Sequence, residues 1–216
     1  MESILSHLSY PAGGDAGELV IGSASYGAGG RGAEIGYALA DSPCGRMLLA
    51  ATRHGVCWIG IHVEDSFLIA ELRRDLPAAE IVGESAQARI ALDNILNCYF
   101  KLRPLKVSLD ILAPPFHGRV WRELCRIPWG ATRSYGEIAR RLGQPCAFRA
   151  VGRANGSNPL AVLIPCHRAL GADGRLTGYR WGLDYKRRLL AFERSQRAQA
   201  APESSVAAPL PLRLES

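Results

Sequence analysis

The 216-residue chain is long enough for one large domain or two small ones, and 48% hydrophobic residues provide for a buried core. No charged leader with a long apolar run opens it, and no apolar run reaches membrane-spanning length, which predicts a protein without membrane contact. The spacing of its cysteines, which fits neither a zinc ribbon nor a disulfide framework, predicts a reducing, cytoplasmic location. The net charge of +6 is segregated. Residues 1–115 carry 9 basic and 13 acidic side chains, whereas residues 116–194 carry 15 and 5. A strongly basic half is typical of nucleic-acid binding.

The cysteines and histidines give no metal-site pattern. The six cysteines are far apart and include no C-x-x-C pair, which argues against a zinc ribbon and against a dense disulfide framework. Four of the histidines are scattered, and ordinary surface or core roles suit them better than metal ligation. We therefore expect neither a metal nor a cofactor.

The first half of the chain predicts an α/β domain. Residues 1–34 are rich in Gly, Ser and Ala and predict a flexible segment. Pro114-Pro115 predicts a boundary, which limits the first domain to residues 35–115. Within it we expect four strands, a turn at His54-Gly55 and two helices. The strands are Tyr37–Ala40, Arg46–Ala51, Val56–His62 and Val107–Leu112, and the helices are Asp65–Leu76 and Ser85–Phe100.

Residues 116–194 predict an α-rich second domain. The apolar run Leu160–Ile164 predicts one strand within it, and residues 195–216 predict a disordered tail because they include three prolines and few large side chains. The expected helices are Phe116–Arg126, Tyr135–Leu142, Phe148–Asn155 and Asp184–Arg194.

Two of these helices form a helix-turn-helix pattern. Ser134 can cap the first helix with Glu137 in the reciprocal position, and Gly143 can end it. The second helix is built from small residues and has low helix propensity. The pattern fits two core helices packed through alanines, or a DNA-binding unit whose backbone approaches DNA closely while Arg149 projects. The local positive charge favours DNA. The small residues are Ala147, Ala150, Gly152, Ala154 and Gly156.

A cysteine and a histidine stand side by side in Pro165-Cys166-His167-Arg168. A histidine near a thiol can take its proton and so produce a nucleophilic thiolate. For the dipeptide alone, a buried free cysteine beside an incidental histidine is the simpler interpretation. The motifs around it favour the catalytic one.

Residues Ile35 to Glu193 resemble the O6-alkylguanine-DNA alkyltransferases (methylated-DNA–protein-cysteine methyltransferases), and most closely the C-terminal domain of bacterial Ada. Several motifs agree in order and spacing, and the segment around Cys166 is the most specific of them. The matching motifs are Ser134-Tyr135, Arg149-Ala150-Val151-Gly152, Asn158-Pro159, Ile164-Pro165-Cys166-His167-Arg168, Gly178-Tyr179-Arg180-Trp181-Gly182 and Lys186 through Glu193.

The resemblance implies an RNase H-like α/β domain, followed by an α-rich domain with the helix-turn-helix and the reactive cysteine. It implies direct repair of O6-methylguanine, and of O4-methylthymine, in double-stranded DNA by a monomeric protein. The damaged nucleotide is flipped from the minor-groove side, and the alkyl group is transferred irreversibly, once per molecule.

The resemblance also implies the catalytic roles. Cys166 attacks the alkyl carbon, His167 takes the thiol proton, and Glu193 orients His167. Tyr135 donates towards N3 of the leaving guanine and crowds the phosphate, and Asn158 positions the active-site loop.

The remaining implied roles concern DNA contact and the pocket. Arg149 fills the space left by the flipped base, and the bulk of Trp181 predicts poor acceptance of benzyl adducts. The implied DNA contacts are Ser134, Tyr135, Ala147, Arg149, Ala150 and Gly152, and the pocket residues are Tyr179, Arg180, Trp181 and Lys186.

Each role has a simpler alternative. Glu193 could be an exposed helix-end carboxylate, Tyr135 a core residue, Trp181 a packing residue and Lys186 an ordinary helix lysine. Two other functions also fit parts of the sequence. A non-catalytic damage sensor of the alkyltransferase-like kind would lack Cys166, and a transcriptional regulator would place the helix-turn-helix in the major groove of undamaged DNA.

Overall fold

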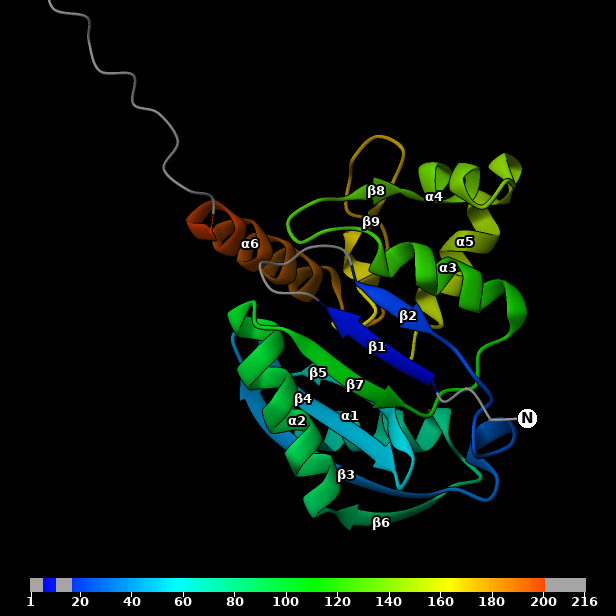
Figure 1. Ribbon diagram of the computed structural model, residues 1–216, viewed down its shortest axis with the longest axis vertical. Coiled ribbons are helices and arrows are strands. Elements are labelled where there is room, and N and C mark those ends of the chain that lie inside the picture. Colours follow the sequence, from blue (N-terminus) through cyan, green and yellow to red (C-terminus); the bar gives the residue numbers. More distant parts are fainter. Residues whose placement is uncertain (1–5, 11–16, 201–216) are drawn as a thin grey trace, which may run out of the picture.

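The computed structural model describes residues 6–10 and 17–200, which form a mixed α/β fold (Figure 1). One half contains a seven-stranded sheet, and the other half is mainly helical. No helix in the described part of the chain is long and apolar enough to cross a membrane. The strands are β1 (Ser6–Tyr10), β2 (Glu18–Val20), β3 (Glu34–Ser42), β4 (Gly45–Thr52), β5 (Gly55–His62), β6 (Glu80–Glu84), β7 (Leu105–Leu109), β8 (Arg133–Ser134) and β9 (Ala169–Leu170).

The large sheet has the strand order β2-β1-β7-β5-β4-β3-β6. β3, β4 and β5 form an antiparallel meander, and the tight turn at Arg53 and His54 lies one residue earlier than expected. β5 pairs with β7 at only one position, Val56 with Leu109. Further along β5, Ile59 instead pairs with Leu160 of the helical half. The sheet is thereby joined directly to the segment that precedes Cys166.

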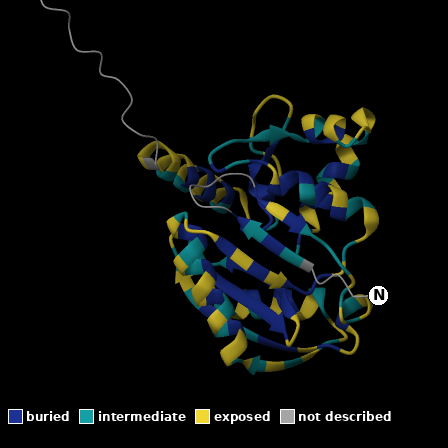
Figure 2. Cartoon of the chain, viewed as in Figure 1, coloured by how far each residue is buried: buried dark blue, intermediate teal, exposed yellow. Residues whose placement is uncertain are grey.

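Helices cover both faces of this sheet. In Figure 1, α2 lies in front of the sheet and α1 behind it. β4 and β5 are therefore buried along almost their whole length, as Figure 2 shows. The helices are α1 (Asp65–Asp75), α2 (Ala86–Cys98), α3 (Pro115–Cys125), α4 (Tyr135–Arg141), α5 (Phe148–Gly156) and α6 (Leu183–Ala200), with 3-10 turns η2 (Ala28–Gly30), η3 (Tyr99–Lys101), η4 (Pro145–Ala147) and η5 (Cys166–Arg168).

The expected flexible segment at residues 1–34 is corrected where the structure describes it. β1 pairs antiparallel with both β2 and β7, so it extends the sheet. The reason is the alternation of side chains along a strand: Leu8 and Tyr10 are buried, whereas the alternate residues His7 and Ser9 are only half-buried. Residues 1–5 and 11–16 lie outside the described part.

The helical half packs α3, α4 and α5 against one another. Trp121 of α3 is fully buried, and its indole Nε1 donates to the carbonyl oxygen of Ala154 in α5 at 2.8 Å. α4 and α5 are joined by the short turn η4, as the sequence predicted. Ser134 and Glu137 form the expected capping box.

The strand expected at Leu160–Ile164 is wrong, although all five residues are completely buried. The segment folds as consecutive turns, in which Ile164 N–H donates to Leu160 O and Leu163 N–H to Ala161 O. Val162 has a φ of +71°, which is strained for a β-branched residue. A short apolar run bounded by turn residues predicts burial but does not determine backbone conformation.

The last helix is longer than expected. α6 continues through residues 195–200, which we expected to belong to a disordered tail. Arg197 stabilises the extension, because its Nη1 donates to Trp129 O at 2.9 Å. The remainder of the expected tail, residues 201–216, lies outside the described part of the chain.

Candidate active site

Cys166 begins the 3-10 turn η5, directly after the loop of residues 157–165, which is buried from Leu160 onward. Its side chain lines a cavity of about 480 Å³ between α5 and the loop of residues 177–181. The residue is only 5% exposed, so a group that reaches the sulfur must enter this cavity.

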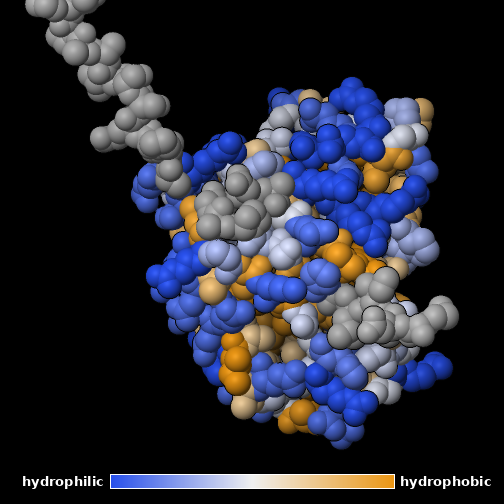
Figure 3. Space-filling model, in the orientation of Figure 1, coloured by the Kyte–Doolittle hydropathy of each residue, from blue (hydrophilic) through white to orange (hydrophobic). Residues whose placement is uncertain are grey.

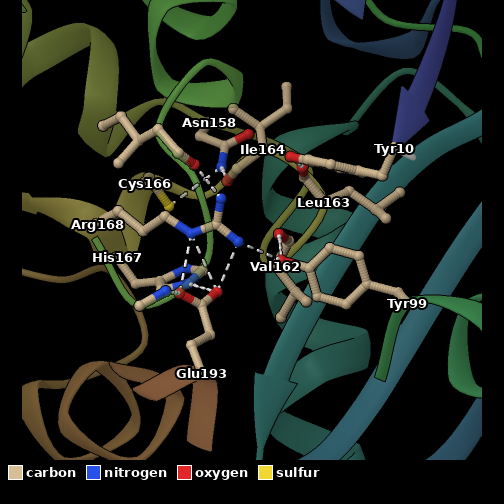
Figure 4. Close-up of polar contacts among 12 residues, drawn as sticks. Tyr10, Tyr99, Asn158, Val162, Leu163, Ile164, Cys166, His167, Arg168 and Glu193 are labelled. Carbon is tan, nitrogen blue, oxygen red and sulfur yellow. Dashed lines mark hydrogen bonds and ion pairs between the residues drawn. The ribbon is translucent and has the colours of Figure 1, made fainter. Parts of the chain in front are cut away.

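Asn158 binds the sulfur and the loop together. Its Nδ2 donates to Cys166 Sγ at 3.1 Å and to Ile164 O at 2.8 Å, while its Oδ1 accepts from Leu160 N–H at 2.9 Å (Figure 4). One amide thus fixes both ends of the strained loop and stabilises negative charge on the sulfur.

The side chains of His167 and Glu193 form a buried, hydrogen-bonded pair. His167 Nε2 lies 2.7 Å from Glu193 Oε1, and both side chains are almost inaccessible. A carboxylate can only accept, so His167 Nε2 carries the hydrogen and Nδ1 keeps its lone pair. Nδ1 is buried and has no protein hydrogen-bond partner among the described residues. The free basic nitrogen of His167 is therefore Nδ1.

Arg168 completes the cluster from the other side. Its Nε and Nη2 donate to the Glu193 carboxylate at 2.7–3.1 Å, and its Nη2 also donates to Tyr99 Oη at 3.1 Å. Burial alone would raise the pKa of Glu193, but Arg168 and His167 outweigh it and hold that pKa at about 2. Glu193 is therefore ionised at neutral pH, and the exposed-carboxylate alternative is excluded.

The thiol itself is protonated at rest. Burial raises the pKa of Cys166, and the Asn158 hydrogen bond and the Lys186 ammonium only partly oppose it. Burial also lowers the pKa of His167 despite the neighbouring carboxylate, so His167 is neutral near pH 7. A neutral thiol beside a neutral imidazole requires proton transfer during the reaction rather than before it.

Lys186 lies behind the cavity rather than in its wall. It is fully buried, and its Nζ donates to Ala169 O at 2.7 Å and to Thr177 O at 2.9 Å. Burial lowers the pKa of Lys186 to about 8, although Cys166 opposes the shift. Lys186 is thus not an ordinary helix lysine, because it is buried in the first turn of α6 and its ammonium binds carbonyls outside that helix, where it places a positive charge near the sulfur.

The cavity wall is aromatic. Tyr135, Tyr179 and Trp181 line it together with Gly152 and Asn155 of α5. The hydroxyl of Tyr135 lies 3.4 Å from Thr177 Oγ1, a weak contact that leaves it available to a ligand.

Trp181 both lines the cavity and packs on the sheet. Its ring meets Trp58 edge-on, with the centroids 5.4 Å apart. Gly60 makes room for this pair: a Cβ there would lie 2.4 Å from Trp58 Cη2 and 2.8 Å from Trp181 Cη2.

Arg180 also lines the cavity, but its guanidinium is bound to the sheet half. Its Nη2 lies 2.7 Å from Asp75 Oδ2 and 3.1 Å from Glu71 Oε2, and the guanidinium stacks over Trp181. The sequence placed Arg180 in the pocket wall. The structure adds that α1 anchors it.

Of the residues expected to contact DNA, Tyr135 and Gly152 line this cavity, whereas Ser134 lines a separate surface pocket. Arg149 is exposed near the start of α5, and Ala147 and Ala150 are half-buried beside it. A Cβ at Gly152 or Gly156 would meet no protein atom within 4 Å. This face of α5 is therefore open, and hydrophilic residues gather around α3 and α4 in Figure 3.

Three residues of the site were missed from the sequence. Tyr10 and Tyr99 reach across from the sheet half and donate to Leu163 O at 2.7 Å and Val162 O at 3.0 Å (Figure 4). Asn155 of α5 lines the cavity, and its buried Oδ1 has no hydrogen-bond partner within the described part of the chain. For Tyr10, the alternation of residues 7–10 was an available signal. The other two depend on tertiary contacts.

Comparison with known proteins agrees with this geometry. Residues 115–195 match the family model of the 6-O-methylguanine DNA methyltransferase DNA-binding domain. A methylated-DNA–protein-cysteine methyltransferase of Mycobacterium tuberculosis is 42% identical over 164 residues, covering 75% of this chain and 94% of that protein. The chain belongs to the methylated-DNA–protein-cysteine methyltransferase family.

Other relatives define how far the likeness extends. The bifunctional transcriptional activator/DNA repair enzyme Ada of Escherichia coli is 39% identical over 166 residues, which are 76% of this chain but only 47% of Ada. The crystal structure of M. tuberculosis OGT in complex with DNA matches with a TM-score of 0.61 and 38% identity, over 76% of this chain and 94% of that chain.

Proposed function

We propose that this protein repairs O6-alkylguanine in double-stranded DNA by transferring the alkyl group to Cys166. The observation that carries the proposal is the cavity that ends at the Cys166 sulfur, with Asn158 bound to that sulfur. The neutral His167, which follows Cys166 in the chain, is hydrogen-bonded to the ionised Glu193. This is the arrangement that an activated nucleophile requires.

The chemistry balances as an in-line displacement. The sulfur forms a bond to the alkyl carbon while the bond from that carbon to guanine O6 breaks. The thiol proton passes to His167 Nδ1, through a water molecule, and Glu193 stabilises the imidazolium that results. Tyr135 donates towards N3 of the leaving guanine. The product is a thioether with no route to cleavage, so each molecule reacts once.

Access to the lesion requires base flipping, since O6 of guanine is covered within the duplex. We propose that α4, η4 and α5 act as a helix-turn-helix that enters the minor groove. Gly152 permits the close approach, because no described residue outside its own stretch of helix lies within 4 Å of the position that a Cβ would take. Arg149 fills the gap in the stack. Ser134, Tyr135, Ala147 and Ala150 contact the flanking backbone.

The proposal also includes the two domains, the oligomeric state, a second substrate and the cellular compartment. The sheet half, residues 35–115 extended by β1 and β2, is an RNase H-like domain, and residues 116–194 are the domain that binds DNA and reacts. We propose a monomer that also accepts O4-methylthymine. All six cysteines are free, which suits a reducing compartment such as the cytoplasm.

Intact mass spectrometry tests the function. After incubation with a duplex containing O6-methylguanine, the protein should gain the mass of one methylene on the peptide that contains Cys166. Cys166→Ser should gain nothing. Cys98→Ser, which removes a half-buried free cysteine of α2 in the sheet half, should react like the wild type. His167→Ala should slow transfer yet still bind DNA. An unchanged mass, or a label on another residue, would overturn the proposal.

A further inference from the structure

Phe148, the first residue of α5, is an exposed aromatic residue that the function described above does not use. Its side chain is 46% exposed, and it does not pack against the hydrophobic core. The other phenylalanines of the helical half, Phe116 and Phe192, both pack against that core. An exposed phenyl ring can stack on a nucleic-acid base.

The position of Phe148 on α5 indicates which kind of partner its ring would contact. Residues four and seven positions later on a helix share its face. Those residues are Gly152 and Asn155, and both line the cavity that contains Cys166. Phe148 therefore lies one helical turn before Gly152, on the face of α5 that lines the cavity.

Phe148 also contacts Arg149. The Arg149 guanidinium carbon lies 5.6 Å from the centroid of the Phe148 ring. Successive bases of one strand are about 3.4 Å apart along the helix axis. A ring at this distance from the arginine can therefore reach the base step that flanks the gap.

We propose that Phe148 is a second wedge: its ring stacks on the base next to the flipped nucleotide while Arg149 occupies the gap itself. Apolar side chains that enter the minor groove commonly unstack base steps in this way. The proposal rests on the repair function and adds to it a residue that opens the duplex. Phe148 acts on the undamaged neighbour and does not touch the reacting atoms.

The test compares transfer from duplex DNA with transfer from free O6-methylguanine. Phe148→Ala should slow transfer from the duplex by about tenfold, because stacking of a base on an aromatic side chain is lost. Transfer from the free base should stay within about twofold of the wild type, since no stack has to open. Phe148→Trp should retain duplex activity. Ile90→Ala, which removes an exposed apolar side chain of α2, is the matched control and should behave as the wild type.

A second substrate sharpens the test. A mismatch beside the lesion lowers the energy of unstacking, so the deficit of Phe148→Ala should shrink on that duplex. Equal slowing on duplex and free base would show that Phe148 is merely structural and would overturn the proposal. Wild-type rates on the intact duplex would also overturn it. If the wild type transfers no methyl group to any substrate, the repair function itself fails.

Discussion

Glu193 is a buried carboxylate that binds both a neutral imidazole, His167, and a guanidinium, Arg168. Oε1 accepts from His167 and Arg168, while Oε2 accepts from Arg168 and from Gly130 N–H at 3.2 Å. With every lone pair engaged, the carboxylate stays ionised without water. Because Arg168 shares the negative charge, Glu193 fixes the His167 tautomer without greatly raising its basicity.

The free energy of unfolding should depend on pH, because the pKa of Glu193 is lower in the folded protein than in the unfolded chain. Its pKa is about 2 in the folded protein and near 4.5 when unfolded, so the unfolded chain binds more protons between these values. The stabilisation is present above pH 4.5 and is lost as the pH falls towards 2. Glu193→Gln should lower the free energy of unfolding at pH 7 by about 3–5 kcal/mol, since Arg168 loses its counter-charge.

Denaturant melts at several pH values measure this effect. The variant should lose less stability than the wild type between pH 4.5 and pH 3. Parallel curves for the two proteins would contradict the assignment of the charge to Glu193.

Trp181 should restrict the size of the transferred group. The indole forms one wall of the cavity and is fixed by Trp58 and Arg180, so it has no room to retreat. The wild type should react more slowly with O6-benzylguanine than with O6-methylguanine, and Trp181→Gly should narrow the difference despite a stability loss of about 3–5 kcal/mol. Competition between the two free bases measures the ratio. Equal rates in the wild type would exclude this role.

At the scale of elements, Gly152 lowers the stability of α5 but leaves room for DNA to approach the helix backbone. A glycine in a helix costs about 1 kcal/mol relative to alanine, and nothing in the protein prevents a methyl group at Gly152. Gly152→Ala should therefore raise the melting temperature and weaken binding to duplex DNA. Thermal melts and fluorescence anisotropy measure the two effects, and transfer from the free base is the internal control. Tighter DNA binding by the variant would contradict the proposed approach of α5 to the groove.

The helices and the meander could be predicted because their signals are local. Capping at Ser134, the breaks at Pro77 and Pro114 and the alternating apolar residues each lie within a few positions of the element they define. The loop of residues 157–165 could not be predicted in this way. Its turns depend on Tyr10 and Tyr99, which satisfy buried carbonyls from positions at least 60 residues away in the chain.

The candidate site followed the same division. Cys166 and His167 are adjacent in sequence, so a thiol with a neighbouring base could be proposed from the motif. The roles of Glu193 and Asn158, by contrast, came from the family resemblance. The anchor of Arg180 on α1 and the shared use of Glu193 by Arg168 were not visible, because charged residues far apart in sequence give no local sign of their pairing. Burial of these pairs is a property of the folded chain alone.

Across the whole molecule, charge is divided between the two halves, and this division should govern association with DNA. Arg153 is exposed on α5 and has no ion pair among the described residues. Arg153→Gln should weaken binding to all duplexes alike and reduce the slope of log K against log salt by about 1. Arg73→Gln, an exposed arginine on α1 of the sheet half, is the matched control and should leave the slope unchanged. If the wild type and both variants gave the same slope of log K against log salt, the proposed contact between DNA and Arg153 of α5 would be wrong.

The sheet half contributes more than support. At Gly60, the absent side chain is what allows the indoles of Trp58 and Trp181 to pack edge to face at the wall of the cavity. Adding even a methyl group there would force Trp181 forward and narrow the chamber, with no change in any residue that a lesion touches. The repertoire of adducts is thus tunable by remote substitutions in β5, and screens for altered substrate range should include the strand as well as the pocket.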